Sequence, residues 1–223
     1  MIEHSFGPAL RCSASRVIRG AVAVAVATLI LPVTADAQRR ERGYMGTLTY
    51  SPAAPTGDTK NFVDDFSWLG FTLEGDWFGW RPDVSMGFII GWQEMYQEAN
   101  NDSFDFPIGT TTGRTYRHIA AVPLLFRGRY WANADKQIQP FVGAGLGTYW
   151  VKQMLDFGIY TGDEDHWHFG VAPEIGVMMT TRGGLGWTLN ARYNYPVQAG
   201  DYLSGDKKAW AYWGFGVGIG MAR

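Results

Sequence analysis

The segment from Trp210 to Met221 divides its side chains into two very different sets when every second residue is taken together. One set is large and apolar: Ala211, Trp213, Phe215, Val217, Ile219 and Met221. The other set becomes bare glycine: Trp210, Tyr212, Gly214, Gly216, Gly218 and Gly220. A period of two indicates an extended strand, because successive side chains point to opposite faces. Glycine inside a strand weakens it unless something must approach closely. The pattern therefore favours a narrow transmembrane barrel, with lipid outside and a crowded lumen inside.

The same alternation recurs in eight segments of the chain. Their predicted bounds are 44–51, 66–80, 84–96, 114–131, 138–153, 167–180, 185–197 and 209–221. The connections alternate between short ones (81–83, 132–137, 181–184) and long ones (52–65, 97–113, 154–166, 198–208). Outer-membrane barrels have short periplasmic turns and longer outer loops. We therefore predict an all-β fold over residues 44–223, an eight-stranded antiparallel up-and-down transmembrane β-barrel in an outer membrane, with both termini in the periplasm.

A soluble up-and-down barrel with its apolar face inward is the main alternative. Eight strands enclose only enough room for side chains or one small ligand. The large apolar sets of this chain would overpack that space and would leave the glycine face in water for no reason. No stretch after residue 37 approaches 18 consecutive apolar residues, so a helical membrane protein is excluded.

The first 37 residues have the features of a cleaved signal peptide. Basic residues precede an apolar run and a small-x-small cleavage site: Arg11, Arg16 and Arg19, then 21–33, then Ala35-Asp36-Ala37. An uncleaved anchor is the alternative, although the run is shorter than the about 20 residues that a spanning helix needs. Residues 38–43 are then predicted to be a periplasmic N-terminal segment.

Charge and cysteine content narrow the possible partners of the remaining chain. Residues 38–223 carry 16 Lys and Arg against 19 Asp and Glu. They have no excess of basic residues to bind a phosphate backbone, so nucleic acid is not an expected partner. The only cysteine, Cys12, lies within the predicted signal. The exported chain can therefore cross an oxidising compartment without forming a disulfide.

The predicted lumen contains three acids and three bases. By alternation, the inward-facing charged residues are Glu74, Asp76, Glu174, Arg127, Arg129 and Arg192. We place Glu174 and Arg192 near mid-height and the other four toward the periplasmic half. Buried charges must be paired, and the arginine fork suits carboxylates, so these residues are interpreted as a network that fills and stiffens the lumen. The alternative is a gate, in which exchange of carboxylate partners opens a narrow ion path.

Histidines supply two weaker hypotheses. His166 and His168 fall on one face of a strand, and Asp163 and Asp165 lie nearby, which makes these four residues candidate metal ligands. Solvated acidic loops are the simpler interpretation, and we predict neither a metal nor any other cofactor.

His118 is predicted to face lipid or the outer rim. No serine stands two residues from it in a His-x-Ser arrangement, so a lipid-modifying enzyme is disfavoured.

The segment Pro140-Phe141-Val142-Gly143-Ala144-Gly145-Leu146-Gly147 is similar to the strand-five motif of small eight-stranded outer-membrane barrels. These are the outer-membrane protein A barrel, outer-membrane protein X, opacity-type and outer-membrane protein W families. The length after residue 37 suits the W or opacity type better than the X type. Members usually end on an aromatic residue that the barrel-assembly machinery recognises, and this chain ends Gly220-Met221-Ala222-Arg223.

These observations favour a non-enzymatic barrel with an envelope-structural role or a surface-interaction role through its outer loops. A wide porin needs about 16 strands, so free diffusion of nutrients is not expected. The W-type resemblance implies an alternative, a narrow gated channel or a lateral route for small hydrophobic molecules. Expected partners are outer-membrane lipid, including lipopolysaccharide, the barrel-assembly machinery, and a surface ligand or envelope protein. A monomer is expected.

Overall fold

The computed structural model describes residues 43–106, 109–157, 160–181, 183–197 and 209–222. The predicted signal peptide (1–37), most of the predicted 38–43 segment and the predicted outer connection 198–208 lie outside the described residues. Within the described part, no helix is long and apolar enough to cross a membrane.

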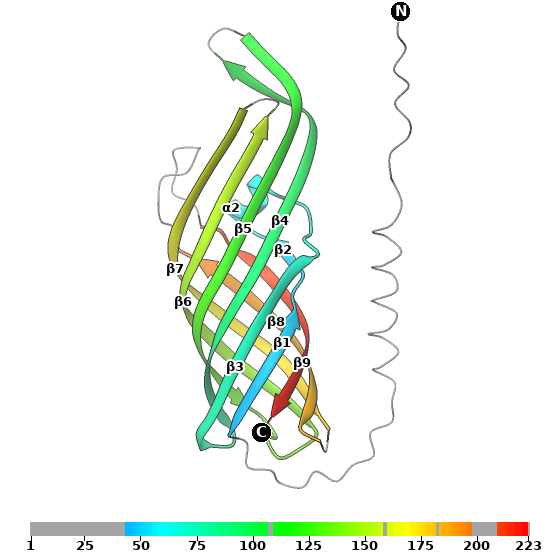
Figure 1. Ribbon diagram of the computed structural model, residues 1–223, viewed down its shortest axis with the longest axis vertical. Coiled ribbons are helices and arrows are strands. Elements are labelled where there is room, and N and C mark those ends of the chain that lie inside the picture. The colour runs from blue at the N-terminus through cyan, green and yellow to red at the C-terminus, as the bar shows by residue number, and fades with distance from the viewer. Residues whose placement is uncertain (1–42, 107–108, 158–159, 182, 198–208, 223) are drawn as a thin grey trace, which may run out of the picture. The chain divides into compact units, whose positions relative to one another are not determined.

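Eight antiparallel strands form a closed ring, which confirms the predicted fold class (Figure 1). The elements are β1 (Tyr44–Tyr50), β2 (Ala53–Pro55), α2 (Asp58–Phe62), β3 (Leu69–Arg81), β4 (Val84–Phe106), β5 (Gly109–Trp131), β6 (Ile138–Phe157), β7 (Tyr160–Thr180), β8 (Leu185–Pro196) and β9 (Tyr212–Ala222). Each ring strand pairs with its neighbour in sequence order, and β1 closes the ring by pairing with both β3 and β9. The short β2 continues the edge of β1 along β9.

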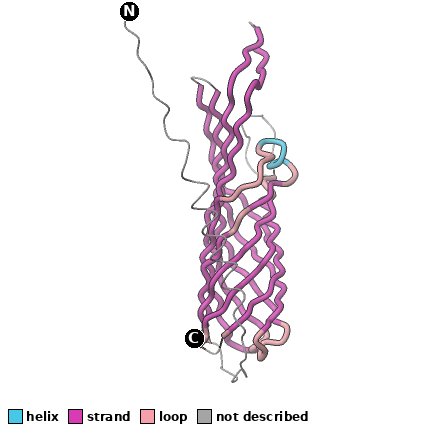
Figure 2. Tube along the Cα trace, turned by 90° about the vertical axis from the view of Figure 1, so that its right-hand side faces the viewer, coloured by secondary structure: helices cyan, strands magenta, loops and turns pink. Residues whose placement is uncertain are grey.

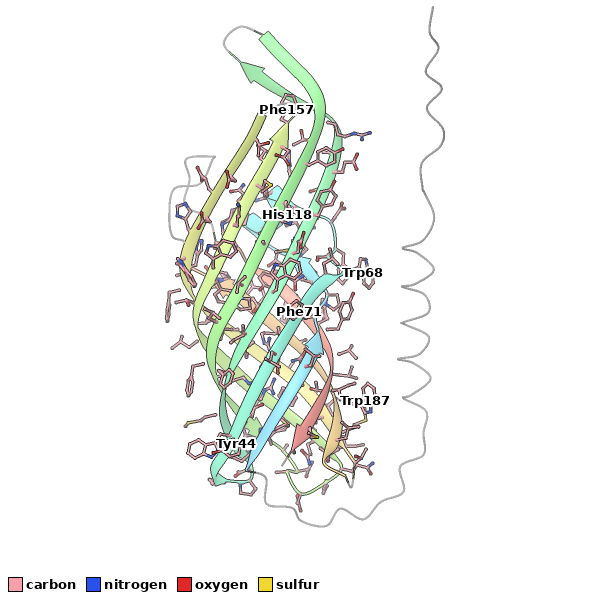
Figure 3. The ribbon with its side chains drawn as sticks, in the orientation of Figure 1. Tyr44, Trp68, Phe71, His118, Phe157 and Trp187 are labelled. Carbon is pink, nitrogen blue, oxygen red and sulfur yellow. The ribbon has the colours of Figure 1, made fainter. Side chains whose placement is uncertain are left out.

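Side chains alternate around this ring as the sequence predicts. In β9, Trp213, Phe215 and Val217 are each at least 40% exposed, whereas the glycines between them are buried. The interior is crowded beside these glycines, because a Cβ added at Gly218 would lie only 2.6 Å from the Leu48 carbonyl oxygen. Figure 3 shows the outward aromatic side chains along the ring. The soluble barrel with an apolar interior required the opposite placement and is wrong.

Two of the predicted long loops are β-hairpins instead. Residues 97–113 continue β4 and β5, whose pairing reaches Phe106 opposite Gly109, and residues 154–166 continue β6 and β7 up to Phe157 opposite Tyr160. These extensions rise beyond the other strands (Figures 1 and 2). Alternating hydrophobicity marks a strand only where one of its faces is apolar. A hairpin that extends beyond the apolar outer surface of the ring keeps its backbone pairing but no longer shows this alternation. We call this the hairpin end and the opposite end, with the short connections, the turn end.

The first connection is also ordered, although the sequence predicts a plain loop at 52–65. It contains β2 and α2, which pack against inward-facing residues at the hairpin end. Val63 and Ala53 are fully buried there, and the ring of Phe62 meets that of Trp210 edge-on at a centroid distance of 5.9 Å. The Asp58 carboxylate accepts a hydrogen bond from the Ala209 N–H (3.0 Å). The connection therefore covers the interior from the hairpin end.

Candidate functional site: the lumen charge cluster

Four strands carry the six predicted charged residues into one place. β3 supplies Glu74 and Asp76, and β5 supplies Arg127 and Arg129, because residues two apart on a strand share a face. β7 supplies Glu174, and β8 supplies Arg192 directly opposite it. Glycines stand between the partners in register: Gly87 between Asp76 and Arg127, and Gly143 between Arg129 and Glu174. With no side chain on the intervening strand, the charged groups meet across it.

Each arginine of the cluster joins two or more carboxylates. Arg127 donates to Asp76 through Nε and Nη2 (3.1 and 2.5 Å) and to Glu74 through Nη1 (2.6 Å). Arg129 donates to Glu174 through Nε (2.5 Å), to Glu74 through Nη2 (2.9 Å) and to Asp76 through Nη1 (3.2 Å). Arg192 donates through Nη2 to Glu74 (2.5 Å) and Glu174 (2.8 Å). Hydrogen bonds between a guanidinium and carboxylates are stronger than neutral ones, and two parallel bonds from one guanidinium also fix the orientation of the side chains.

The six residues form one connected cluster, in which Glu174 and Arg192, predicted near mid-height, contact residues predicted toward the periplasmic half. Glu74 and Glu174 share Arg129 and Arg192. Barrel strands are tilted and staggered, so counting along two distant strands does not give their relative heights. Three positive and three negative side chains, all at most 6% exposed, make this charged layer neutral.

Neighbours that the sequence analysis did not single out complete this layer. The Thr72 hydroxyl donates to Glu74 (3.1 Å), and the Ser85 hydroxyl donates to Asp76 (3.2 Å). Trp131 Nε1 donates in turn to the Ser85 oxygen (2.9 Å). The Arg129 guanidinium lies 4.3 Å from the centroid of the Phe141 ring, within cation–π range. Alternation places all of these residues inward, but which of them touch depends on the register of several strands.

Apolar side chains fill the interior on both sides of the charged layer. Toward the turn end lie Met45, Phe78, Trp131, Phe141 and Met178. Toward the hairpin end lie Ala53, Val63, Ile89, Met95, Ile119, Ala121, Leu125, Tyr149, Val151, Ala172, Trp210 and Tyr212. The charges therefore lie between two apolar clusters.

The candidate metal ligands do not share a face. His166 and His168 point inward, whereas Asp163 and Asp165 point outward because they fall on the other phase of β7. Asp163 pairs with Lys152 (3.1 Å), and Asp165 accepts a hydrogen bond from Trp150 Nε1 (3.0 Å). Among the described residues, no group of three or more His, Cys, Asp or Glu side chains is placed to hold a metal ion. The structure therefore does not bring these four residues together.

His118 shares the outward phase of β5 with the exposed Leu124 and Phe126 and therefore does not face the lumen. Figure 3 labels its position on the ring. Its Nε2 lies 2.7 Å from the Glu94 carboxylate, a partner that the sequence analysis missed. Further up the same face, Arg114 pairs with Glu98 (3.1 Å) and donates to the Tyr116 hydroxyl (3.2 Å). The His118–Glu94 and Arg114–Glu98 pairs join β5 to β4, whereas Arg114 and Tyr116 both lie on β5. The more exposed Arg114–Glu98 pair contributes little to stability.

Comparison with solved structures finds several barrels of similar architecture. Neisserial surface protein A aligns with a TM-score of 0.49 and 11% identity, over 81% of this chain and 97% of that one. Ail, the attachment invasion locus protein of Yersinia pestis, in complex with the heparin analogue sucrose octasulfate, aligns with a TM-score of 0.44 and 13% identity, over 81% and 100%. The outer membrane protease OmpT from Escherichia coli aligns with a TM-score of 0.45 and 7% identity, over 82% and 94%.

No protein-family model matches the sequence, and no curated protein matches it. The named structures include both surface proteins and a protease, and they single out no common activity. The resemblance to the outer-membrane protein W and opacity families stays a prediction.

Proposed function

We propose that the chain is an integral outer-membrane barrel with a closed lumen, without enzymatic activity, and that it acts in envelope structure or in surface interaction through its hairpin end. The observation that carries the proposal is the outward apolar band. Large apolar side chains are exposed on every ring strand, including Leu73 (53%), Phe126 (62%) and Ile175 (59%). A continuous exposed apolar surface around a closed barrel is suited to lipid and not to water.

Aromatic residues stand at both margins of this band. Tyr44, Trp77 and Trp187 lie at the turn end, and Trp68, Trp167 and Trp213 lie toward the hairpin end; all but Trp187 are at least 40% exposed. Amphipathic rings at the two interfaces are typical of membrane barrels. The band between them is the part that we place in the membrane.

The two ends of the barrel differ in charge. At the hairpin end, residues 52–68, 94–118 and 152–168 contain 11 Asp and Glu against 4 Lys and Arg. At the turn end, the described residues 43, 81–83, 132–137, 181, 183–184 and 222 contain 2 Asp and Glu against 2 Lys and Arg. Together with the short turns, this asymmetry supports a periplasmic turn end and an outward, acidic hairpin end. Surface partners and lipopolysaccharide would then meet the hairpins, and we propose that the chain is a monomer.

Thiol labelling of intact cells tests both the location and the orientation. In a Cys12→Ser background, Asp163→Cys places a thiol at the hairpin end, and Lys136→Cys places one in a short turn. We expect a membrane-impermeant maleimide to label the first variant on intact cells, and the second only after the outer membrane is permeabilised. The reverse pattern would overturn the orientation, and equal labelling of both variants on intact cells would overturn the periplasmic turn end.

A narrow gated channel is the second candidate, and it draws on the same charge cluster. Exchange of carboxylates among three arginines is geometrically available, since Glu74 already contacts all three. Apolar clusters nevertheless flank the charges on both sides, which supports the proposal of a closed lumen. We therefore expect planar-bilayer recordings of the refolded barrel to show no conductance steps, and the same silence for Glu174→Gln and Arg192→Gln. Discrete steps that change with either substitution would favour the gate.

A further inference from the structure

A groove marks the outer surface of the barrel near the turn end. It lies between β4, β5 and β6, has a volume of about 420 Å³, and is lined by Val84, Met86, Gly128, Tyr130, Val142 and Gly143 among others. Tyr130 and Val142 are each more than half exposed, so the groove opens outward, onto the apolar band. Its size lies within the usual range of small-molecule sites. Its lining is mostly apolar, apart from Ser85 and Arg129.

Gly128 forms the floor of this groove, and packing does not require a glycine there. A Cβ built at Gly128 has no atom within 4 Å, whereas Cβ atoms at Gly87, Gly143 or Gly147 would overlap neighbouring backbone. Gly128 sits in register between Met86 and Ala144, and its outward neighbours on β5 are Phe126 and Tyr130. The absence of a side chain therefore opens a slot in an otherwise bulky apolar surface.

A polar group closes the turn end of the slot. Val84 pairs with Arg81 on one side and with Tyr130 on the other, which brings a guanidinium and a phenol to the same margin. Arg81 holds Asp83 through Nε (2.9 Å) and Nη2 (2.7 Å), and this hydrogen bonding lowers the pKa of the Asp83 carboxyl. The Arg81 side chain is still 70% exposed.

We infer that this groove binds one anionic phospholipid of the membrane leaflet at the turn end. One acyl chain fills the slot over Gly128, and the phosphate lies against Arg81 and the Tyr130 hydroxyl. An apolar slot that ends beside the exposed Arg81 guanidinium matches a lipid, which has its phosphate at the end of its acyl chains, and arginine is the side chain best suited to phosphate. The inference rests on the proposed membrane location and goes beyond it by naming a specific ligand class.

Native mass spectrometry of the chain purified from membranes tests the site. The probe is an equimolar mixture of phosphatidylglycerol and phosphatidylethanolamine in the detergent micelle. We expect one phosphatidylglycerol to stay bound per barrel. Gly128→Val fills the floor of the slot and is expected to lower retention about tenfold, the effect of about 1.4 kcal/mol. Arg81→Gln is expected to leave one lipid bound but to abolish the preference for phosphatidylglycerol.

Gly46 supplies a matched control. It is also outward and exposed, and a Cβ there also meets nothing within 4 Å, but it does not line the groove. Gly46→Val should therefore retain lipid like the unmodified chain. Equal retention in the unmodified chain and Gly128→Val, or equal losses in Gly128→Val and Gly46→Val, would overturn the site. Correct thiol labelling together with either result would overturn this inference alone, whereas failed labelling would overturn the proposed location.

Discussion

Replacement of Glu74 by glutamine is expected to lower the free energy of unfolding by about 3–5 kcal/mol, the usual cost of breaking a buried ion pair from one side. Glu74 is the most connected member of the charge cluster, since it accepts hydrogen bonds from Arg127, Arg129, Arg192 and Thr72. The glutamine keeps the size of the side chain but leaves one buried positive charge without compensation. The loss should therefore greatly exceed that of an isolated hydrogen bond.

Urea titration of the refolded barrel in vesicles, followed by tryptophan fluorescence, measures this change. Asp83→Asn is the control, because it breaks an exposed arginine–carboxylate pair and should leave the unfolding midpoint nearly unchanged. The double variant Glu74→Gln with Arg192→Gln restores neutrality and should recover part of the loss, which would appear as non-additivity. A single variant Glu74→Gln within about 1 kcal/mol of the parent would show that the cluster is not held by mutual neutralisation.

Gly87→Ala is expected to destabilise the barrel by about 1–3 kcal/mol or more, although it adds a single methyl group. A Cβ at Gly87 would overlap the carbonyl oxygen of Gly75 on β3, and a backbone atom cannot rotate away as a side-chain tip can. Relief requires β3 and β4 to separate beside Asp76 and Arg127, where their side chains meet across Gly87. The strain therefore acts on the wall and on the charge cluster together.

Gly128→Ala is the matched comparison, since it adds the same methyl group on the open, outward face of β5. The same urea titration should place Gly128→Ala at or slightly above the stability of the parent, because the substitution also restricts the unfolded chain. Equal destabilisation of the two variants would mean that the effect comes from strand glycine itself and not from the close approach at Gly87.

The alternation in β9 predicts the fold because it depends on local geometry alone. A residue and its second neighbour share a face in any strand, so the inward charges and the outward apolar band follow from counting. The relative heights of Glu74 and Glu174 do not follow, because they depend on the stagger of strands far apart in the sequence. The partnership of Glu94 with His118 also depends on the register between β4 and β5.

The hairpin end was the least predictable part for a related reason. The extensions of β4 to β7 stand beyond the apolar band, so backbone pairing continues there without an apolar face to mark it. The segment containing α2 is hard to predict from the sequence for a different reason. Its five-residue helix is too short to show a period, and the fully buried Val63 packs in a cluster with residues of remote strands.

The balance of charge in the buried layer has an electrical consequence. The work that a voltage does on charges within a membrane scales with their sum, at about 2.3 kcal/mol per elementary charge for each 100 mV. Three arginines and three carboxylates sum to zero, so a uniform field across the membrane exerts no net force on the cluster. The barrel therefore carries six charged side chains in its interior without a net response to a membrane voltage.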